Sequence, residues 1–126
     1  MELASALRLV VRDLERTGGP ALRVADESVT ADPAYESVVL LSAQWPARTG
    51  LLAPREMSGA ELVQHVADQV QEFVVEELWL AGRSTSWPEC EEHPGTHPLE
   101  AQLVEDAAVW VCPKSGHTVA DVGELS

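Results

Sequence analysis

The residues best suited to chemistry lie in two short segments near the end of the chain. Both cysteines and three of the four histidines fall within residues 90–117. The first segment has the spacing Cys-x2-His-x3-His, and the second has the pattern Cys-Pro-x2-Gly-His. Thiolate sulfur and imidazole nitrogen are ligands that Zn2+ prefers, and two tight loops can bring four such donors to one tetrahedral centre. The pattern therefore predicts a bound zinc ion.

Five donor residues compete for the four positions of such a centre. Cys90 and Cys112 come first because thiolates dominate structural zinc sites, and His93 follows from its two-residue spacing. The fourth ligand is His97 or His117. We favour His97, because a Cys-x2-His-x3-His stretch can wrap one ion and a proline stiffens the loop after each of its histidines. The predicted ligand set is Cys90, His93, His97 and Cys112, with His117 as the alternative fourth ligand.

The remaining histidine, His65, has helical spacing to Asp68 and Glu72, so one helix face could carry all three side chains. We interpret this group as an ordinary solvated helix face rather than as a metal site. The sequence has no HExxH motif, phosphate-binding loop, dinucleotide fingerprint or Ser-His-Asp set. We therefore predict no catalytic residues.

A first helix and a β ribbon are predicted to precede these segments. Apolar residues recur at helical spacing over residues 2–17, and Gly18-Gly19-Pro20 stops this helix. Strands are predicted at 22–25 and 35–43. A loop is predicted over 44–57, because this stretch contains two prolines and a glycine.

A second helix is predicted over residues 59–81, and Ser58-Gly-Ala-Glu61 has the pattern of a capping box at its start. Its predicted polar side carries Asp68, Glu72, Glu76 and Glu77. The apolar residues that it should bury are Leu62, Val66, Val70, Phe73, Val74 and Leu78. This face is the predicted spine of the hydrophobic core.

The segment after the second helix has the pattern of a zinc ribbon. A loop around Cys90 would be followed by two strands, 107–112 and 118–122, joined by a tight turn. Trp87 and Trp110 flank the two cysteines and are predicted to form the dry wall of the site. The predicted fold class is therefore α+β, with two helices, a small β ribbon or sheet and a C-terminal zinc-ribbon-like β-hairpin.

At 126 residues the chain is long enough for one hydrophobic core and too short for two. We predict a single domain, 1–126, in which residues 1–86 form a helix-ribbon-helix core and residues 87–126 a zinc-ribbon-like subdomain. No stretch approaches the roughly 18 apolar residues of a membrane span, and the start of the chain lacks the pattern of a secretory signal. We expect a cytoplasmic protein without membrane contact, in which both cysteines stay reduced.

The net charge of −13 is concentrated in the second half of the chain. Residues 1–57 carry six arginines against eight acidic residues, whereas residues 58–126 carry only Arg83 and Lys114 against thirteen. A surface of this sign repels phosphate groups, so direct nucleic-acid binding is not expected. The same charge would attract a protein partner with a basic surface.

The composition also indicates the type of genome. The chain has no isoleucine, no asparagine and one lysine, residues whose codons are AT-rich, which points to a high-GC source. About the last 50 residues carry Trp-Pro-x-Cys-x2-His-Pro and His-Pro-Leu, followed by Trp-x-Cys-Pro-x2-Gly. This pattern resembles small uncharacterised proteins of actinobacteria. The resemblance implies the same compartment and ligand set, but no reaction.

Three functions are consistent with these observations. The first, which we prefer, is a non-catalytic interaction or regulatory protein with a structural zinc site. The second is a metal-dependent hydrolase, in which three ligands hold zinc, water fills the fourth position and Glu91, Glu92 or His117 acts as general base. The third is an acidic inhibitor or immunity-type protein that binds a basic partner.

Overall fold

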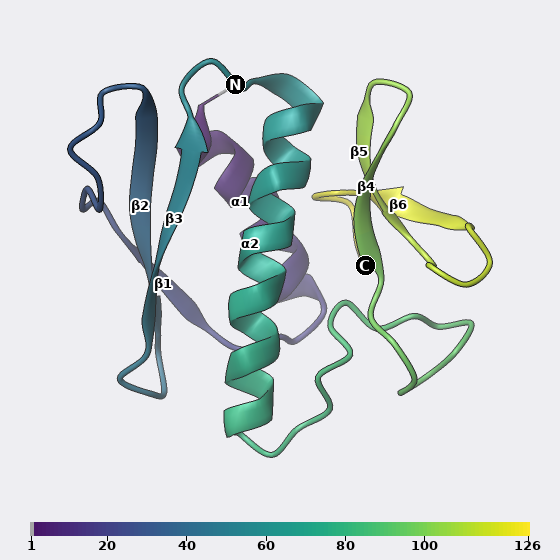
Figure 1. Ribbon diagram of the computed structural model, residues 1–126. Helices are drawn as coiled ribbons and strands as arrows, with labels where there is room; N and C mark the ends of the chain where they lie inside the picture. The colour runs from purple at the N-terminus through teal and green to yellow at the C-terminus, as the bar shows by residue number, and fades with distance from the viewer. Residues whose placement is uncertain (1) are drawn as a thin grey trace.

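The computed structural model describes residues 2–126, and in this part of the chain α2 stands between two small antiparallel sheets (Figure 1). One sheet has the strand order β1-β2-β3 and the other β4-β5-β6, while α1 packs against α2. The elements, in chain order, are α1 (Leu3–Arg16), β1 (Leu22–Ala25), β2 (Tyr35–Ser42), β3 (Arg48–Pro54), α2 (Gly59–Leu80), β4 (Glu100–Val104), β5 (Ala107–Val111) and β6 (Thr118–Asp121). The predicted α+β class is confirmed.

The prediction of a loop over 44–57 was wrong, because β3 occupies half of that segment and pairs with β2 along its whole length. Gly50 lies inside this strand, where a Cβ would come within 2.9 Å of Val29 on the covering loop. Pro54 is tolerated because β3 is an edge strand. Alternate residues of a strand direct their backbone N–H and C=O groups to the same edge. Those of Leu52 point away from β2 to Gln69, so Pro54, two residues later, owes β2 no N–H hydrogen bond.

The C-terminal part of the chain forms a sheet of three strands rather than a two-stranded hairpin. The predicted strands at 107–112 and 118–122 correspond to β5 and β6. Elsewhere in the chain, both helices begin and end within one residue of their predicted limits. β4 was not predicted, and it pairs with β5 from Glu100 to Val104. The zinc-ribbon character of this part stays a prediction.

The buried face of α2 was predicted correctly for its six apolar residues. Glu77, predicted on the polar side, is instead only 3% exposed. Ser42 Oγ donates a 2.6 Å hydrogen bond to Glu77 Oε2, which gives the buried carboxylate a partner. The predicted capping box was also wrong: the Ser58 side chain makes no capping bond, because Gly59 starts the helix with φ +59° rather than a helical angle.

Glutamine side chains of α2 connect the helix to both sheets. Gln69 accepts from the backbone N–H of Leu52 at 3.2 Å and donates to the carbonyl of the same residue at 2.8 Å, so it covers the free edge of β3. On the opposite sheet, Gln64 donates to a carbonyl of β4, and Gln71 donates to the carbonyl of Leu99 just before that strand. These bonds satisfy backbone groups at strand edges that would otherwise lack partners.

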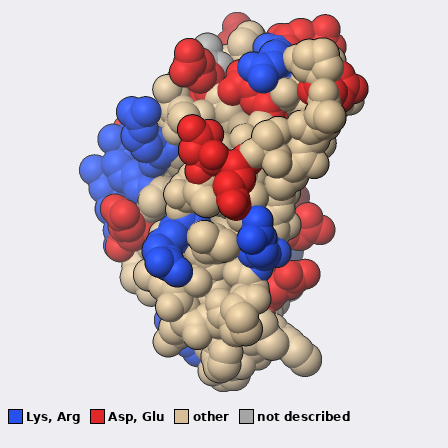
Figure 2. Space-filling view, turned by 90° about the vertical axis from the view of Figure 1, so that its left-hand side faces the viewer, with Lys and Arg blue, Asp and Glu red and all other residues tan. Residues whose placement is uncertain are grey.

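The outer side of the β1-β2-β3 sheet carries charges of both signs side by side (Figure 2). Arg48 forms an ion pair with Glu27 at 3.0 Å, and Arg55 approaches Glu36 at 3.8 Å. Such exposed pairs contribute little to stability, but they place an acidic group beside Arg48 and beside Arg55. No helix among residues 2–126 is both long and apolar enough to cross a membrane.

The buried pair of Ser42 and Glu77 generates a stability prediction. Ser42→Ala should lower the free energy of unfolding by about 2 kcal/mol, because Glu77 loses its hydrogen-bond donor while staying buried. The hydroxyl also accepts from the backbone N–H groups of Gln44 and Trp45, which would lose their partner. Chemical denaturation measures this change.

The control is Ser28→Ala, which removes an exposed hydroxyl and should change stability by less than about 0.5 kcal/mol. The double variant Ser42→Ala, Glu77→Leu should recover part of the loss, since it removes the buried carboxylate together with its partner. Equal stability of Ser42→Ala and the wild-type protein would contradict the importance of this bond.

Candidate metal centre

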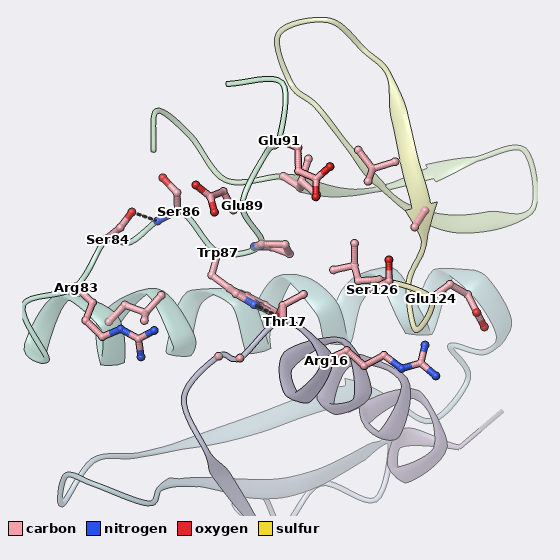
Figure 3. A pocket seen from close by; sticks show the side chains of 18 residues that line it. Arg16, Thr17, Arg83, Ser84, Ser86, Trp87, Glu89, Glu91, Glu124 and Ser126 are labelled. Atoms are coloured by element: carbon pink, nitrogen blue, oxygen red, sulfur yellow. Dashed lines mark hydrogen bonds between the residues drawn. The ribbon is translucent and has the colours of Figure 1, made fainter. Parts of the chain in front are cut away.

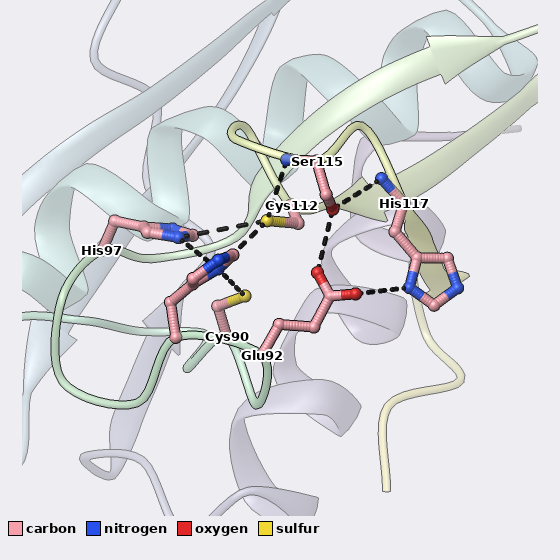
Figure 4. A network of polar contacts seen from close by, with 7 residues as sticks. Cys90, Glu92, His97, Cys112, Ser115 and His117 are labelled. Carbon is pink, nitrogen blue, oxygen red and sulfur yellow. Dashed lines mark hydrogen bonds and ion pairs between the residues drawn. The ribbon is translucent and has the colours of Figure 1, made fainter.

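Two tight loops, one before β4 and one after β5, form the candidate metal centre (Figure 4). The first follows α2 and runs from Cys90 to His97, where a turn bond joins His93 N–H to the carbonyl of Cys90 at 3.1 Å. The second begins at Cys112, directly after β5, and Gly116 N–H closes its turn on the carbonyl of Cys112 at 2.8 Å. Gly116 has φ +77°, a backbone angle that glycine adopts without strain.

The two loops bring together Cys90, His93, His97 and Cys112, whose donor atoms all lie within 4.8 Å of one another. His93 Nδ1 lies 3.1 Å from His97 Nε2, 3.6 Å from Cys90 Sγ and 3.5 Å from Cys112 Sγ. The Cys112 Sγ to His97 Nε2 distance is 3.9 Å. A tetrahedral zinc centre with bonds of about 2.0–2.3 Å has ligand separations of about 3.3–3.8 Å. The cluster therefore has the dimensions of a site that could hold a metal ion.

The two sides of the cluster differ in their exposure. Both cysteine side chains are 0% exposed and belong to the hydrophobic core, whereas His93 and His97 are half-buried. Trp87 and Trp110 are buried in the same core, with their ring centroids 5.8 Å apart in an edge-to-face arrangement. The sulfur side is thus dry, and the imidazole side lies closer to solvent.

The polar contacts around the cluster favour the metal-binding forms of two ligands. His97 Nδ1 is 3.0 Å from the carbonyl of Pro98, so this nitrogen carries the proton and leaves the lone pair on Nε2 facing the cluster. Ser115 N–H donates to Cys112 Sγ at 3.5 Å. Burial raises the pKa of the Cys112 thiol, but hydrogen bonds from Ser115, Lys114 and Cys90 lower that pKa by more, which favours the thiolate.

His117, the alternative fourth ligand, does not join the cluster. Its Nδ1 lies 2.9 Å from Glu92 Oε1, and its side chain is 65% exposed. The other oxygen of Glu92 accepts from Ser115 Oγ at 2.8 Å, so this carboxylate links the first loop to the second. Hydrogen bonds from Ser115 and then from His117 lower the pKa of Glu92. This linking role of Glu92 was not predicted, although its position between two predicted ligands, Cys90 and His93, was a usable signal.

His65 lies away from the cluster, on the side of α2 that faces β3. Its Nε2 is 2.8 Å from the carbonyl of Leu52, so this half-buried side chain contributes to the covered edge of that strand. Asp68 and Glu72 are exposed, as expected for a solvated face, although partial burial raises the pKa of Asp68. The interpretation of this face as solvated therefore holds for the two carboxylates but was wrong for His65.

Comparison with protein-family models, with curated proteins and with solved structures gives no match for this chain. The resemblance to actinobacterial proteins stays an expectation from the sequence. The Cys2His2 cluster, with its geometry and chemistry, is therefore the feature of the molecule that bears on function.

The geometry predicts which ring nitrogens face the cluster. In zinc-loaded protein, His93 should bind through Nδ1 and His97 through Nε2, while neither nitrogen of His117 should bind. Correlation spectra of 15N-labelled protein that resolve the two ring nitrogens would measure this. A metal-bound nitrogen in His117, or a proton on Nε2 of His97 in the loaded protein, would contradict the arrangement.

Proposed function

We propose that this protein binds one Zn2+ ion in a closed Cys2His2 centre, and that the ion has a structural rather than a catalytic role. The observation that carries the proposal is the convergence of four donor atoms within 4.8 Å, from two loops that β4 and β5 separate in the sequence. When bound, the ion would join the loop between α2 and β4 to the turn between β5 and β6.

The chemistry of the donors supports zinc over other metals. Two thiolates and one divalent ion form a neutral group, which suits cysteine side chains that are 0% exposed. A monovalent copper ion would leave a negative charge in the core. Mg2+ and Ca2+ prefer oxygen ligands, and Cu2+ or Ni2+ prefer square-planar or tetragonal geometry. Zinc is therefore the metal that the buried sulfur and nitrogen donors favour.

The arrangement supports a structural site over a hydrolytic one. Four protein donors complete a tetrahedral centre and leave no position for a reacting water. Of the residues considered as general base, Glu91 is exposed and Glu92 and His117 bind each other outside the cluster. We accordingly propose a non-catalytic protein.

A protein partner is part of this proposal, and its support is the charge distribution. Residues 58–126 carry the large excess of acidic groups, and Glu91 and Glu92 on the first loop and Glu89 just before it are exposed. A basic protein is the partner class that this surface favours. Its association should slow as salt is raised, because screening acts over about 8 Å at physiological ionic strength. An association rate independent of salt would contradict this part of the proposal.

The zinc proposal predicts about one zinc per chain in protein purified without chelator, measured by elemental analysis. A zinc ligand is removed by each of three substitutions, Cys90→Ser, Cys112→Ser and His97→Ala. Each should weaken zinc binding by more than the roughly 10–100-fold that is typical when a residue hydrogen-bonded to a ligand is removed. His117→Ala should stay within that range, because His117 supports the second loop only through Glu92.

The matched control is His65→Ala, which removes a histidine from the far side of α2 and should leave the zinc content unchanged. Absence of stoichiometric metal from protein made in zinc-replete cells would overturn the proposed function. Loss of zinc from His117→Ala but not from His97→Ala would overturn the ligand set alone.

A further inference from the structure

Both cysteine loops are tied to the end of α1 through the indole of a nearby tryptophan. Trp110, two residues before Cys112, donates from Nε1 to Asp13 Oδ2 at 2.8 Å. Trp87, three residues before Cys90, donates from Nε1 to Thr17 Oγ1 at 2.9 Å (Figure 3). These bonds connect residues that are 97 and 70 positions apart in the chain. Each loop thus has its own anchor on one short stretch of the molecule.

The two anchor residues are four positions apart, which places them one helical turn from each other at the end of α1. Thr17 Oγ1 donates to the carbonyl of Asp13 at 2.8 Å, so its hydroxyl proton is engaged and a lone pair faces the Trp87 indole. The two indole rings contact each other edge to face, with an interplanar angle of 76°. One helical turn therefore fixes both tryptophans and their separation.

The Asp13 carboxylate is held firmly enough to act as an anchor. It is 0% exposed and accepts from Trp110 Nε1, from Gly123 N–H and from Leu125 N–H. A buried carboxylate with these donors has strong, charge-assisted bonds and little freedom to move. The Asp13 side chain therefore gives the Trp110 indole a fixed hydrogen-bond acceptor.

We propose that Asp13 and Thr17 are positioning residues for the metal centre, through which α1 sets the distance between the two cysteine loops. This inference rests on the proposed zinc binding. Neither residue belongs to the donor cluster, so their effect acts through Trp87 and Trp110. A centre with loops held at the correct separation loses less conformational entropy when the ion binds, and so binds zinc more tightly.

The test variant is Thr17→Val, which keeps the shape of the side chain but removes the acceptor for Trp87. Thr17 is exposed and borders a pocket of about 710 Å³, so the substitution has room. Zinc affinity, measured by competition with a chromophoric chelator, should fall about 10-fold, the lower end of the range for outer-sphere contacts. The absorption bands of Co2+-loaded protein should shift as well, because the ligand geometry changes. Thr17→Ser, which keeps the hydroxyl, should restore both values.

The control is Ser42→Ala, which destabilises the fold through the β1-β2-β3 sheet and should leave zinc affinity and the Co2+ spectrum unchanged. If the wild-type protein binds zinc but Thr17→Val and Thr17→Ser bind it with equal affinity, the positioning role is overturned. The proposed function would then stay intact. Equal weakening by Ser42→Ala and Thr17→Val would also overturn it, since the effect would then follow general stability. A wild-type protein that binds no zinc would overturn the proposed function itself.

Discussion

The arrangement of the two ends of the chain depends on the hydrogen bonds to the buried carboxylate of Asp13. Moving a carboxylate out of water costs several kcal/mol unless hydrogen bonds replace its hydration. The replacements come from β5 through Trp110 and from the final residues through Gly123 and Leu125. Because α1 cannot bury this group without those donors, α1 and the β4-β5-β6 sheet stabilise each other. The two cysteine loops adjoin this sheet, one before β4 and one after β5.

The sequence contained a signal for both buried acids. Asp13 falls within the apolar stripe of α1 formed by Leu3, Ala6, Leu7, Val10 and Leu14, and Glu77 falls within the buried stripe of α2. Periodicity predicted both helices to within one residue at each end, because 3.6-residue repeats are a local property of the chain. An acid inside such a stripe indicates a buried group with partners. Which partners it finds depends on the tertiary structure and was beyond the sequence.

Long-range pairing explains what sequence reasoning missed. β3 contains Gly50 and Pro54, which disfavour a strand locally, but pairing with β2 and contact with Gln69 outweigh that preference. The same limit applied to the candidate site. Clustering of rare cysteines and histidines was enough to name five donors, whereas the choice between His97 and His117 depended on how the turn after β5 meets the first loop.

The position of α2 between the sheets also bears on aggregation. A sheet edge with unpaired N–H and C=O groups is a template for pairing with another molecule. Glutamine side chains of the helix bind the backbone of Leu52 at the β3 edge and of Ala101 at the β4 edge, and β1 and β6 are the other edges of the two sheets. These two strands have four residues each and are the shortest among residues 2–126. Short edges offer few backbone groups to a neighbouring chain, so the fold resists intermolecular β-pairing even though it is built from two open sheets.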